Sequence, residues 1–435
     1  MTQTSIAAQA EAQIRAHTIP GLDGLDNDAI FPNYGGLSIA NIAPTFASLL
    51  GIEAGGTPLW DPLWEPYRGR VDRVVFIILD ALGYLQLREA LDADPGANFH
   101  RIAQAGLLVP LTSVFPSTTT AATTTFATGR APLEHGLLGY ELFLREFSRA
   151  ANMILLSGRG ARRSGELVDL GLKYDTFVPV PSVAQRLAVE GIPTFVMLPY
   201  NILDSGLSKL QYRGGKMVPY LSSADIWVGV RHLLTARPGP ALISVYWPGV
   251  DSAAHHYGPD TEMTKAEIRN LAYSLGRELL DGLPASARRR TLLVISADHG
   301  QMRSQPQDAV ELAHQPDLAR RLLFAPTGEA RTAYLYARQG EKAAVLDYLR
   351  QTLGQQFAAW DSDAAYASGL FGPAASAAPE ARSRLGDVVL VARQTYSLQV
   401  EGVHKPPAEM PGRHGALSPA EMLVPWLAAH LEDVA

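Results

Sequence analysis

Four short runs of apolar, mostly β-branched residues constrain the fold of this 435-residue chain more than any other feature. They are RVVFIIL (73–79), PTFVML (193–198), PALISVYW (240–247) and TLLVISA (291–297), and helix-length stretches separate them. The runs are apolar at nearly every position rather than at alternate positions, so both faces of each strand are expected to be buried. This pattern predicts an α/β fold with a doubly wound, mainly parallel sheet sandwiched by helices.

The rest of the chain suggests two additions to this core. Residues 1–66 precede the first run and are predicted to form an N-terminal extension to a main domain of residues 67–435. Later in the chain, ARTAYLYAR (330–338) and DVVLVARQ (387–394) are strand-like and flank a helical stretch. We interpret the segment of about 303–411 as a smaller α+β insertion or lid.

Composition excludes several kinds of function. The chain has no cysteine, which rules out disulfides, thiolate metal sites and cysteine nucleophiles. A formal net charge of −6 means that basic residues are not in excess, so nucleic acid is not expected as a scaffold-like partner. No apolar run approaches the roughly 20 residues that span a bilayer, and the N-terminal residues do not resemble a secretory signal. We therefore expect a cytoplasmic protein with no membrane partner.

Acids and histidines follow three of the predicted strands. Asp80 comes directly after the first run, and Asp298 and His299 follow the last one. Asp251 and His255 follow the third run, and their spacing of four places them on one face if the segment is helical. Taken singly, each is equally well explained as a cap or a buried structural pair. Because ligands of open α/β sheets bind beyond the carboxyl ends of the strands, together they predict one site.

The donors at this edge also predict a chemistry. Carboxylate oxygen and imidazole nitrogen without sulfur suit zinc, with manganese or magnesium as alternatives. Two divalent ions held about 4 Å apart would stabilise both the attacking and the leaving oxygen of an in-line displacement. The pattern therefore predicts transfer of a phosphoryl-type group.

The stretch FPSTTTAATTTFATG (115–129) is crowded with hydroxyl groups. Ser117 is expected to cap a helix that Gly129 ends. A hydroxyl in the first turn of such a helix lies in a field that favours its alkoxide, so one of these residues can be a nucleophile. Composition alone does not distinguish Ser117, Thr118, Thr119 and Thr120.

Five motifs, in order along the chain, resemble those of the alkaline phosphatase superfamily. They are FIILDALGY, FPSTTTAATTTFATGRAPLEHGLLGY, YWPGVDSAAHHYGP, ISADHGQM and GRHGALSPAEM, and they span residues 76–422. The type I phosphodiesterase/nucleotide pyrophosphatase group is the branch that they resemble most. The resemblance implies an alkaline-phosphatase-like catalytic domain and two divalent metal ions, with zinc as the expected metal.

The resemblance also implies the role of each residue. Thr119 matches the nucleophile, which attacks phosphorus and forms a phospho-threonine that is then hydrolysed. The implied ligands of the first ion are Asp80, Thr119, Asp298 and His299, and those of the second are Asp251, His255 and His414. The spacing argument alone does not select His414.

We therefore predict a two-metal hydrolase of phosphate esters that acts on a small phosphodiester or a nucleotide pyrophosphate. The sequence is also compatible with an oligomer. The preference between diesters and monoesters stays open, because many nucleotide pyrophosphatases of the family that this chain resembles carry a donor asparagine three residues after the nucleophile, where this chain has Ala122. The alternatives are a phosphomonoesterase or a manganese-dependent phosphomutase of the same superfamily, and a non-catalytic module that binds a metal or ligand.

Overall fold

The four apolar runs form adjacent strands in the middle of one large sheet, which confirms the predicted fold class. In this computed structural model, which describes residues 3–94 and 96–434, they become β1 (Arg73–Leu79), β6 (Thr194–Pro199), β8 (Ala241–Trp247) and β9 (Thr291–Ser296). The sheet has seven strands in the order β2-β18-β9-β1-β8-β6-β7. The sequence did not predict β2 (Leu107–Thr112), β7 (Lys216–Tyr220) or β18 (Leu423–His430). Of these seven strands, β18 alone runs antiparallel to its neighbours β2 and β9.

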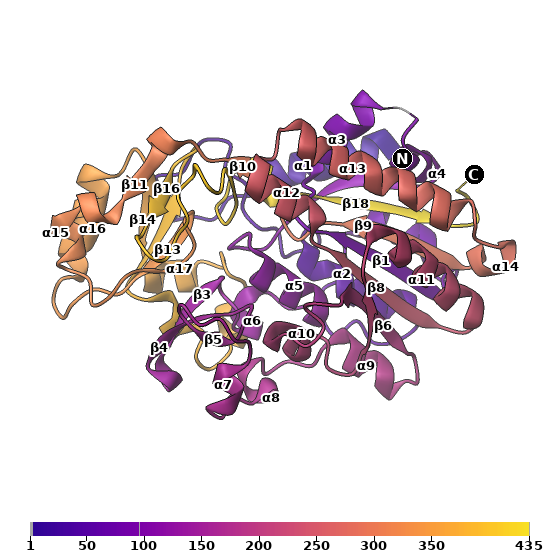
Figure 1. Cartoon of the computed structure of the whole chain (residues 1–435), viewed down its shortest axis with the longest axis horizontal. Coiled ribbons are helices and arrows are strands. Elements are labelled where there is room, and N and C mark those ends of the chain that lie inside the picture. The colour runs from indigo at the N-terminus through magenta and orange to yellow at the C-terminus, as the bar shows by residue number, and fades with distance from the viewer. Residues whose placement is uncertain (1–2, 95, 435) are drawn as a thin grey trace.

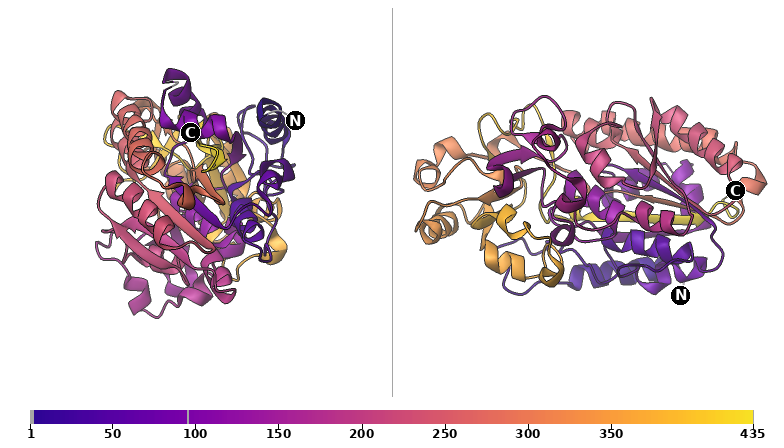
Figure 2. Two further views of the ribbon diagram at one scale, coloured as in Figure 1. Left: turned by 90° about the vertical axis from the view of Figure 1, so that its right-hand side faces the viewer. Right: turned by 90° about the horizontal axis from the view of Figure 1, so that it is seen from below.

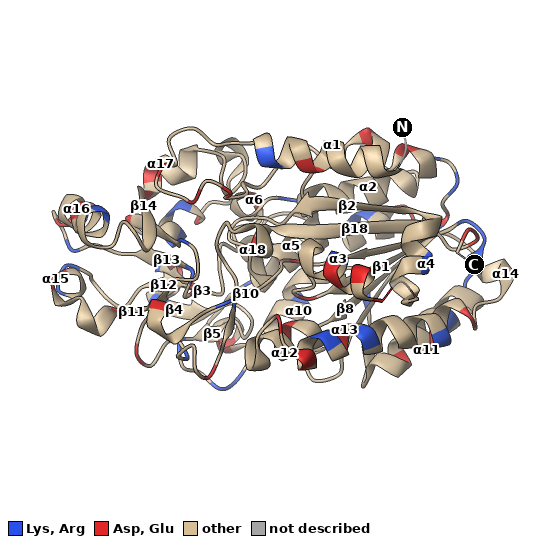
Figure 3. Ribbon diagram, turned by 90° about the horizontal axis from the view of Figure 1, so that it is seen from above, with Lys and Arg blue, Asp and Glu red and all other residues tan. Residues whose placement is uncertain are grey.

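Helices cover both faces of this sheet (Figures 1 and 3). Figure 3 shows α1 (Gln3–Ala16) and α2 (Ile42–Leu49) on one side, and α11 (Ser223–Ala236), α12 (Gly249–Tyr257) and α13 (Glu262–Ser274) on the other. The predicted N-terminal extension packs directly on the sheet. The ring of Phe46, from α2, contacts the ring of Phe76, from β1, edge-on, with the ring centroids 5.1 Å apart. In the right-hand view of Figure 2, these N-terminal helices lie along one long side of the molecule.

Other helices connect the strands. They are α3 (Tyr84–Ala93), α4 (Asn98–Ala105), α5 (Thr119–Thr128), α6 (Pro132–His135), α7 (Glu166–Asp169), α8 (Tyr174–Phe177), α9 (Val183–Val189), α10 (Gly206–Gln211), α14 (Ala285–Arg288) and α18 (Pro419–Met422).

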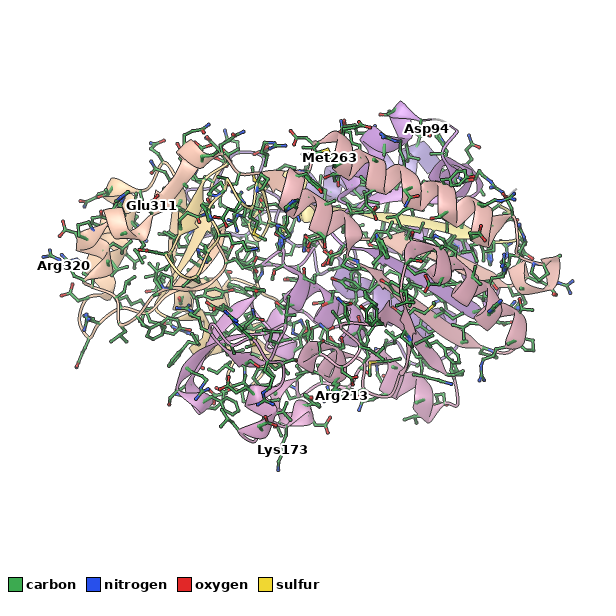
Figure 4. The ribbon with its side chains drawn as sticks, viewed as in Figure 1. Asp94, Lys173, Arg213, Met263, Glu311 and Arg320 are labelled. Atoms are coloured by element: carbon green, nitrogen blue, oxygen red, sulfur yellow. The ribbon has the colours of Figure 1, made fainter. Side chains whose placement is uncertain are left out.

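Charged side chains such as Asp94, Lys173 and Arg320 lie at the periphery of the molecule (Figure 4). In the described part of the chain, no helix combines the length and apolar character needed to cross a membrane.

A second sheet of seven strands forms the other half of the molecule, in the order β14-β15-β13-β12-β3-β4-β5. Its strands are β3 (Glu141–Leu144), β4 (Arg149–Asn152), β5 (Ser157–Gly158), β12 (Thr327–Gly328), β13 (Thr332–Leu335), β14 (Phe357–Asp361) and β15 (Val388–Ala392). Residues 141–158 thus join the segment of about 303–411 that the sequence indicated. This half also contains α15 (Pro316–Ala319), α16 (Lys342–Thr352), α17 (Ser362–Ala367) and a separate apolar cluster.

Two short strand pairs lie outside the large sheets. Strand β10 (Met302–Arg303) pairs with β17 (Gly412–Arg413), and β11 (Ala309–Glu311) pairs with β16 (Ser397–Gln399). The first pair brings the segment after β9 against the segment that precedes β18. The ends of the central strands are also level, because Leu79 of β1 pairs with Trp247 of β8. The residues that follow these strands therefore meet at one edge of the central sheet.

Candidate active site

Two fully buried carboxylates lie at this edge. Asp80 directly follows β1, and Asp298 lies two residues beyond the end of β9. The chain turns sharply after Asp80, because Ala81 has a φ of 62°, in the left-handed region. This turn directs the Ala81 N–H at Asp298, where it donates to Oδ1 at 3.2 Å.

A second group of donors comes from α12 and from the loop after β17. As the spacing predicted, Asp251 and His255 share one face of α12, with Asp251 Oδ1 3.2 Å from His255 Nε2. His414 Nε2 lies 3.2 Å from His255 Nε2 and 3.9 Å from Asp251 Oδ1. These three residues offer ligand atoms within 4.8 Å of one another.

His299 links the two groups. Its Nε2 lies 3.5 Å from Asp80 Oδ1 and 3.4 Å from Asp298 Oδ2, and its ring stacks on that of His414 with centroids 3.8 Å apart. Asp80, Asp251 and His299 form a further set of ligand atoms within 4.8 Å of one another. Asp251 thus belongs to both sets. The structure therefore brings the six predicted acids and histidines together, although the candidate groupings overlap rather than split cleanly in two.

All three histidines present the same nitrogen to the site. Their Nδ1 atoms donate to backbone carbonyl oxygens, at 2.8 Å for His255 to Gly412, 3.0 Å for His414 to Ser117 and 3.1 Å for His299 to Gly300. Because a carbonyl oxygen only accepts, the proton of each neutral ring is on Nδ1. Each Nε2 therefore carries no proton and can offer its lone pair to a metal ion at the centre of the cluster. This arrangement is typical of metal-ligating histidine.

The hydroxyl of Thr119 faces the same centre. Thr119 is the first residue of α5, and its Oγ1 lies 3.1 Å from His299 Nε2. The predicted cap was wrong, because Thr118 rather than Ser117 occupies the N-cap position. Ser117 Oγ instead donates to the Ala416 carbonyl oxygen at 2.8 Å, which holds the start of α5 against the His414 loop. Gly129 ends the helix with a φ of 68°, as predicted.

The neighbouring threonines stabilise the helix. Several donate to backbone carbonyl oxygens one turn earlier, namely Thr123 to Thr119, Thr124 to Thr120 and Thr128 to Thr124. Thr120 donates to the Gly139 carbonyl oxygen, and Thr125 contacts the His135 ring at 3.0 Å. Ala122 is fully buried and belongs to the apolar core.

Burial and crowding perturb the carboxylates. Burial, together with the charges of Asp298 and Asp251, raises the pKa of Asp80 well above its ordinary value. Burial also raises the pKa of Asp298 to about 6. Asp80 Oδ1 and Asp298 Oδ2 are buried and have no hydrogen-bond partner among residues 3–94 and 96–434. Crowded acids with free oxygens are what a bound cation would stabilise.

The histidines respond to the same surroundings. Burial lowers the pKa of His299 to about 4 and that of His414 to about 3, so both rings are neutral and suited to binding a metal. Burial also opposes the charge on Asp251, yet His255 and the other two histidines keep its pKa below the ordinary value. For His255, burial is outweighed by Asp251, which raises the histidine pKa.

Sequence reasoning missed three residues that contact the cluster. The Tyr246 hydroxyl donates to Asp80 Oδ2, and Gln301 Nε2 donates to Asp251 Oδ1. Glu329, from the turn between β12 and β13, has Oε2 3.7 Å from His414 Nδ1. Tyr246 and Gln301 lie within the motifs quoted above, so their positions could have indicated that they contact the site. Glu329 lies in no such motif.

The fold and the site define a member of the alkaline phosphatase superfamily. The family model described as type I phosphodiesterase/nucleotide pyrophosphatase matches residues 74–154 and 210–417. The chain belongs to this family, and it is an enzyme that hydrolyses phosphoesters in the manner of a phosphodiesterase or pyrophosphatase. No curated protein sequence matches it.

Solved structures share the fold at low sequence identity. The chain is similar to murine ectonucleotide pyrophosphatase/phosphodiesterase 5, with 19% identity, a TM-score of 0.61 and coverage of 82% of this chain and 87% of the other. An inactive threonine-to-alanine variant of that murine enzyme, in complex with AMP, matches with a TM-score of 0.60, 19% identity and the same coverage. Phosphonoacetate hydrolase from Sinorhizobium meliloti, in complex with phosphonoformate, has 20% identity, a TM-score of 0.58 and coverage of 83% and 91%.

Proposed function

We propose that this enzyme is a two-metal hydrolase of phosphodiesters or nucleotide pyrophosphates that forms a phospho-threonine on Thr119. One observation carries the proposal. Thr119 Oγ1 lies at the N-terminus of α5, 3.1 Å from His299 Nε2, beside carboxylate oxygens that have no partner in the described chain. A hydroxyl in this position is a candidate nucleophile, and the surrounding acids and imidazoles are candidate metal ligands.

The donor set fits two divalent cations. Oxygen and nitrogen ligands without sulfur favour zinc, and manganese or magnesium are the alternatives. We assign Asp80, Thr119, Asp298 and His299 to the first ion and Asp251, His255 and His414 to the second. When bound, such ions lower the pKa of a hydroxyl and neutralise charge on the attacking and leaving oxygens.

The protein supplies the remaining elements of the reaction. Thr119 Oγ1 gives up its proton to solvent and attacks phosphorus, so that the Oγ1–P bond forms and the bond to the leaving oxygen breaks. The first N–H groups of α5 have no partner within the helix, so they can donate to phosphoryl oxygens of a bound substrate. A water molecule then attacks phosphorus, the Oγ1–P bond breaks and the threonine regains a proton.

The structural relatives support this choice of nucleophile and substrate. The murine enzyme is inactive when a threonine is replaced by alanine, and that variant binds AMP. Phosphonoacetate hydrolase binds small phosphonates. By analogy, a small-molecule phosphate ester or nucleotide is the proposed substrate. The cytoplasmic location, the oligomeric state and the domain boundaries at 1–66, 67–435 and about 303–411 stay predictions.

The test compares three substrates after metal has been removed and zinc or manganese restored separately. The substrates are bis-(p-nitrophenyl) phosphate, p-nitrophenyl phosphate and p-nitrophenyl thymidine monophosphate, and the measurement is kcat/KM. Preference for the two diesters with zinc supports the proposal. Preference for the monoester indicates a phosphatase instead, and activity with manganese but without net hydrolysis indicates a phosphomutase. Stoichiometric metal without turnover on any ester indicates a non-catalytic module.

A further inference from the structure

One deeply buried ion pair, Arg331 with Glu421, lies outside the set of candidate metal ligands. Arg331 directly precedes β13 of the second sheet, and Glu421 belongs to α18, just before β18 of the central sheet. Their side chains are 1% and 0% exposed. Two parallel hydrogen bonds join them, from Nε to Oε1 at 2.7 Å and from Nη2 to Oε2 at 2.9 Å. The pair therefore fixes one half of the molecule to the other.

Glu421 also holds the loop that carries His414. Within this loop, residues 412–418, the Ala416 N–H donates to Glu421 Oε1 at 3.0 Å and the Ser418 hydroxyl donates to Oε2 at 2.6 Å. Each carboxylate oxygen thus accepts one hydrogen bond from Arg331 and one from the loop. Arg331 reaches further, because its Nη1 donates to the Tyr396 carbonyl oxygen at 2.6 Å.

The same residue holds the loop that carries His299, residues 298–301. The Gly300 N–H donates to the backbone carbonyl oxygen of Glu421 at 2.8 Å. Gly300 packs so closely against α18 that an added Cβ would lie 2.0 Å from the Ala420 carbonyl oxygen. Glu421 therefore accepts hydrogen bonds from the residue that follows His299 and from the residue two positions after His414. The rings of these two histidines stack with their centroids 3.8 Å apart.

Stability alone is a weak reason for such a pair. Removing two charges from water is costly, and apolar residues of similar volume often serve a core equally well. Here the Glu421 side chain instead satisfies a backbone N–H and a hydroxyl of the His414 loop, and the Glu421 backbone carbonyl accepts from the His299 loop. Groups that hydrogen-bond metal ligands directly typically change metal affinity 10- to 100-fold when they are replaced, because they orient the ligands, and a shift of the loops would act on the same orientation.

We propose that Arg331 and Glu421 are positioning residues that hold the His299 and His414 loops at the separation needed to bind metal. This inference rests on the proposed metal centre. It predicts that the pair contributes to metal affinity separately from its contribution to folding.

The test uses Glu421→Gln and the double variant Arg331→Met/Glu421→Leu. The double variant leaves no unpaired buried charge, so it separates a loss of folding from a loss of positioning. Glu146→Gln is the matched control, because it removes the partner of another buried arginine, Arg384, whose contacts with Glu146 and the Gly136 carbonyl lie outside both loops. Zinc dissociation constants are measured by competition with a chromophoric chelator. The Tm and the hydrogen exchange of residues 298–301 and 412–418 are measured on the metal-free proteins.

We expect both Glu421 variants to bind zinc at least about tenfold more weakly than wild type. The double variant should lose less Tm than Glu421→Gln, because it leaves no unpaired buried charge, while both loops still exchange faster than in wild type. Glu146→Gln should change neither the zinc affinity nor the exchange of these two loops. Zinc affinity and loop exchange equal to wild type in the double variant would overturn the inference. Wild-type protein that binds no zinc, manganese or magnesium would instead refute the proposed metal centre. Loop exchange in the metal-free proteins would still decide whether the pair holds the loops.

Discussion

The hydroxyl of Tyr246 offers the most direct test of how this site prepares its first carboxylate. Tyr246 lies on β8 directly opposite Ile78 of β1, and it donates to Asp80 Oδ2. That contact leaves Oδ1 facing His299. Tyr246→Phe removes the hydroxyl and keeps the ring, so the carboxylate loses the contact that fixes its rotation.

The structure sets the size of the expected effect. Hydrogen bonds to charged groups contribute about 1.5–3 kcal/mol, and about 1.4 kcal/mol corresponds to a factor of ten in affinity. Zinc affinity should therefore fall roughly 10- to 100-fold, in line with other partners of metal ligands. Tyr246 also lowers the pKa of Asp80 against the stronger effect of burial, so its loss lets protons compete better with the metal. The deficit should thus be larger at about pH 6 than at about pH 8.

Tyr220→Phe is the matched control. The Tyr220 hydroxyl donates to the backbone carbonyl oxygen of Tyr246, so this change also removes one buried tyrosine hydroxyl beside β8 but touches no candidate ligand. Both variants should lose similar stability in thermal unfolding of the metal-free protein. Zinc competition should separate them. If Tyr246→Phe binds zinc as tightly as Tyr220→Phe at both pH values, then Asp80 does not depend on Tyr246 for its orientation and the reasoning is wrong.

Three further outcomes follow from the site and its surroundings. Thr119→Ala should lower kcat/KM by on the order of 10⁴-fold or more while metal content largely persists; near-wild-type rates in steady-state assays would contradict its role as nucleophile. A chelator should abolish turnover and lower the Tm, and zinc at about 100 times its Kd should restore about 2.7 kcal/mol of stability in calorimetry, whereas an unchanged Tm would argue against a metal centre. Burial lowers the pKa of His135 to about 3, so the unfolded chain takes up this proton near pH 6.5 and the folded chain does not. The free energy of unfolding should therefore fall as pH drops from about 6.5 toward 3, and this slope should be smaller in His135→Asn, which urea titrations at several pH values can measure.

The central strands could be predicted from sequence because burial on both faces leaves a continuous apolar run. The first run, residues 73–79, coincides with β1. The edge strand β2 and its neighbour β18 were missed because each contains a proline, which usually argues against a strand. Pro110 and Pro425 lie directly opposite one another, so both missing N–H groups fall at one position in the ladder. Pairing of β18 with β9 begins only at Leu427, beyond that position.

The residues of the candidate site could be predicted from the sequence only in part, for a different reason. Asp80, Asp298 and His299 follow strands whose ends are level, so sheet geometry alone brings them together. His414 is positioned by the pairing of β10 with β17 and by its contact with the Ser117 carbonyl oxygen, which no spacing rule predicts. Only the family resemblance indicated it. The cap at Thr118 was missed because Ser117 has the better capping side chain, which the His414 loop engages instead.

The threonine-rich helix shows why composition could not choose the nucleophile. A helix so rich in hydroxyls is compatible with a buried position only if each hydroxyl has a partner. Thr123 and Thr124 both donate within the helix and also accept from the Gln211 side chain, at 2.7 and 2.8 Å. Their hydroxyls are therefore committed to the fold. Thr119, at the first position of the helix, has no preceding turn to bond, and its hydroxyl contacts His299 instead. Position at the helix start, more than residue type, thus makes this hydroxyl the one that is free to react.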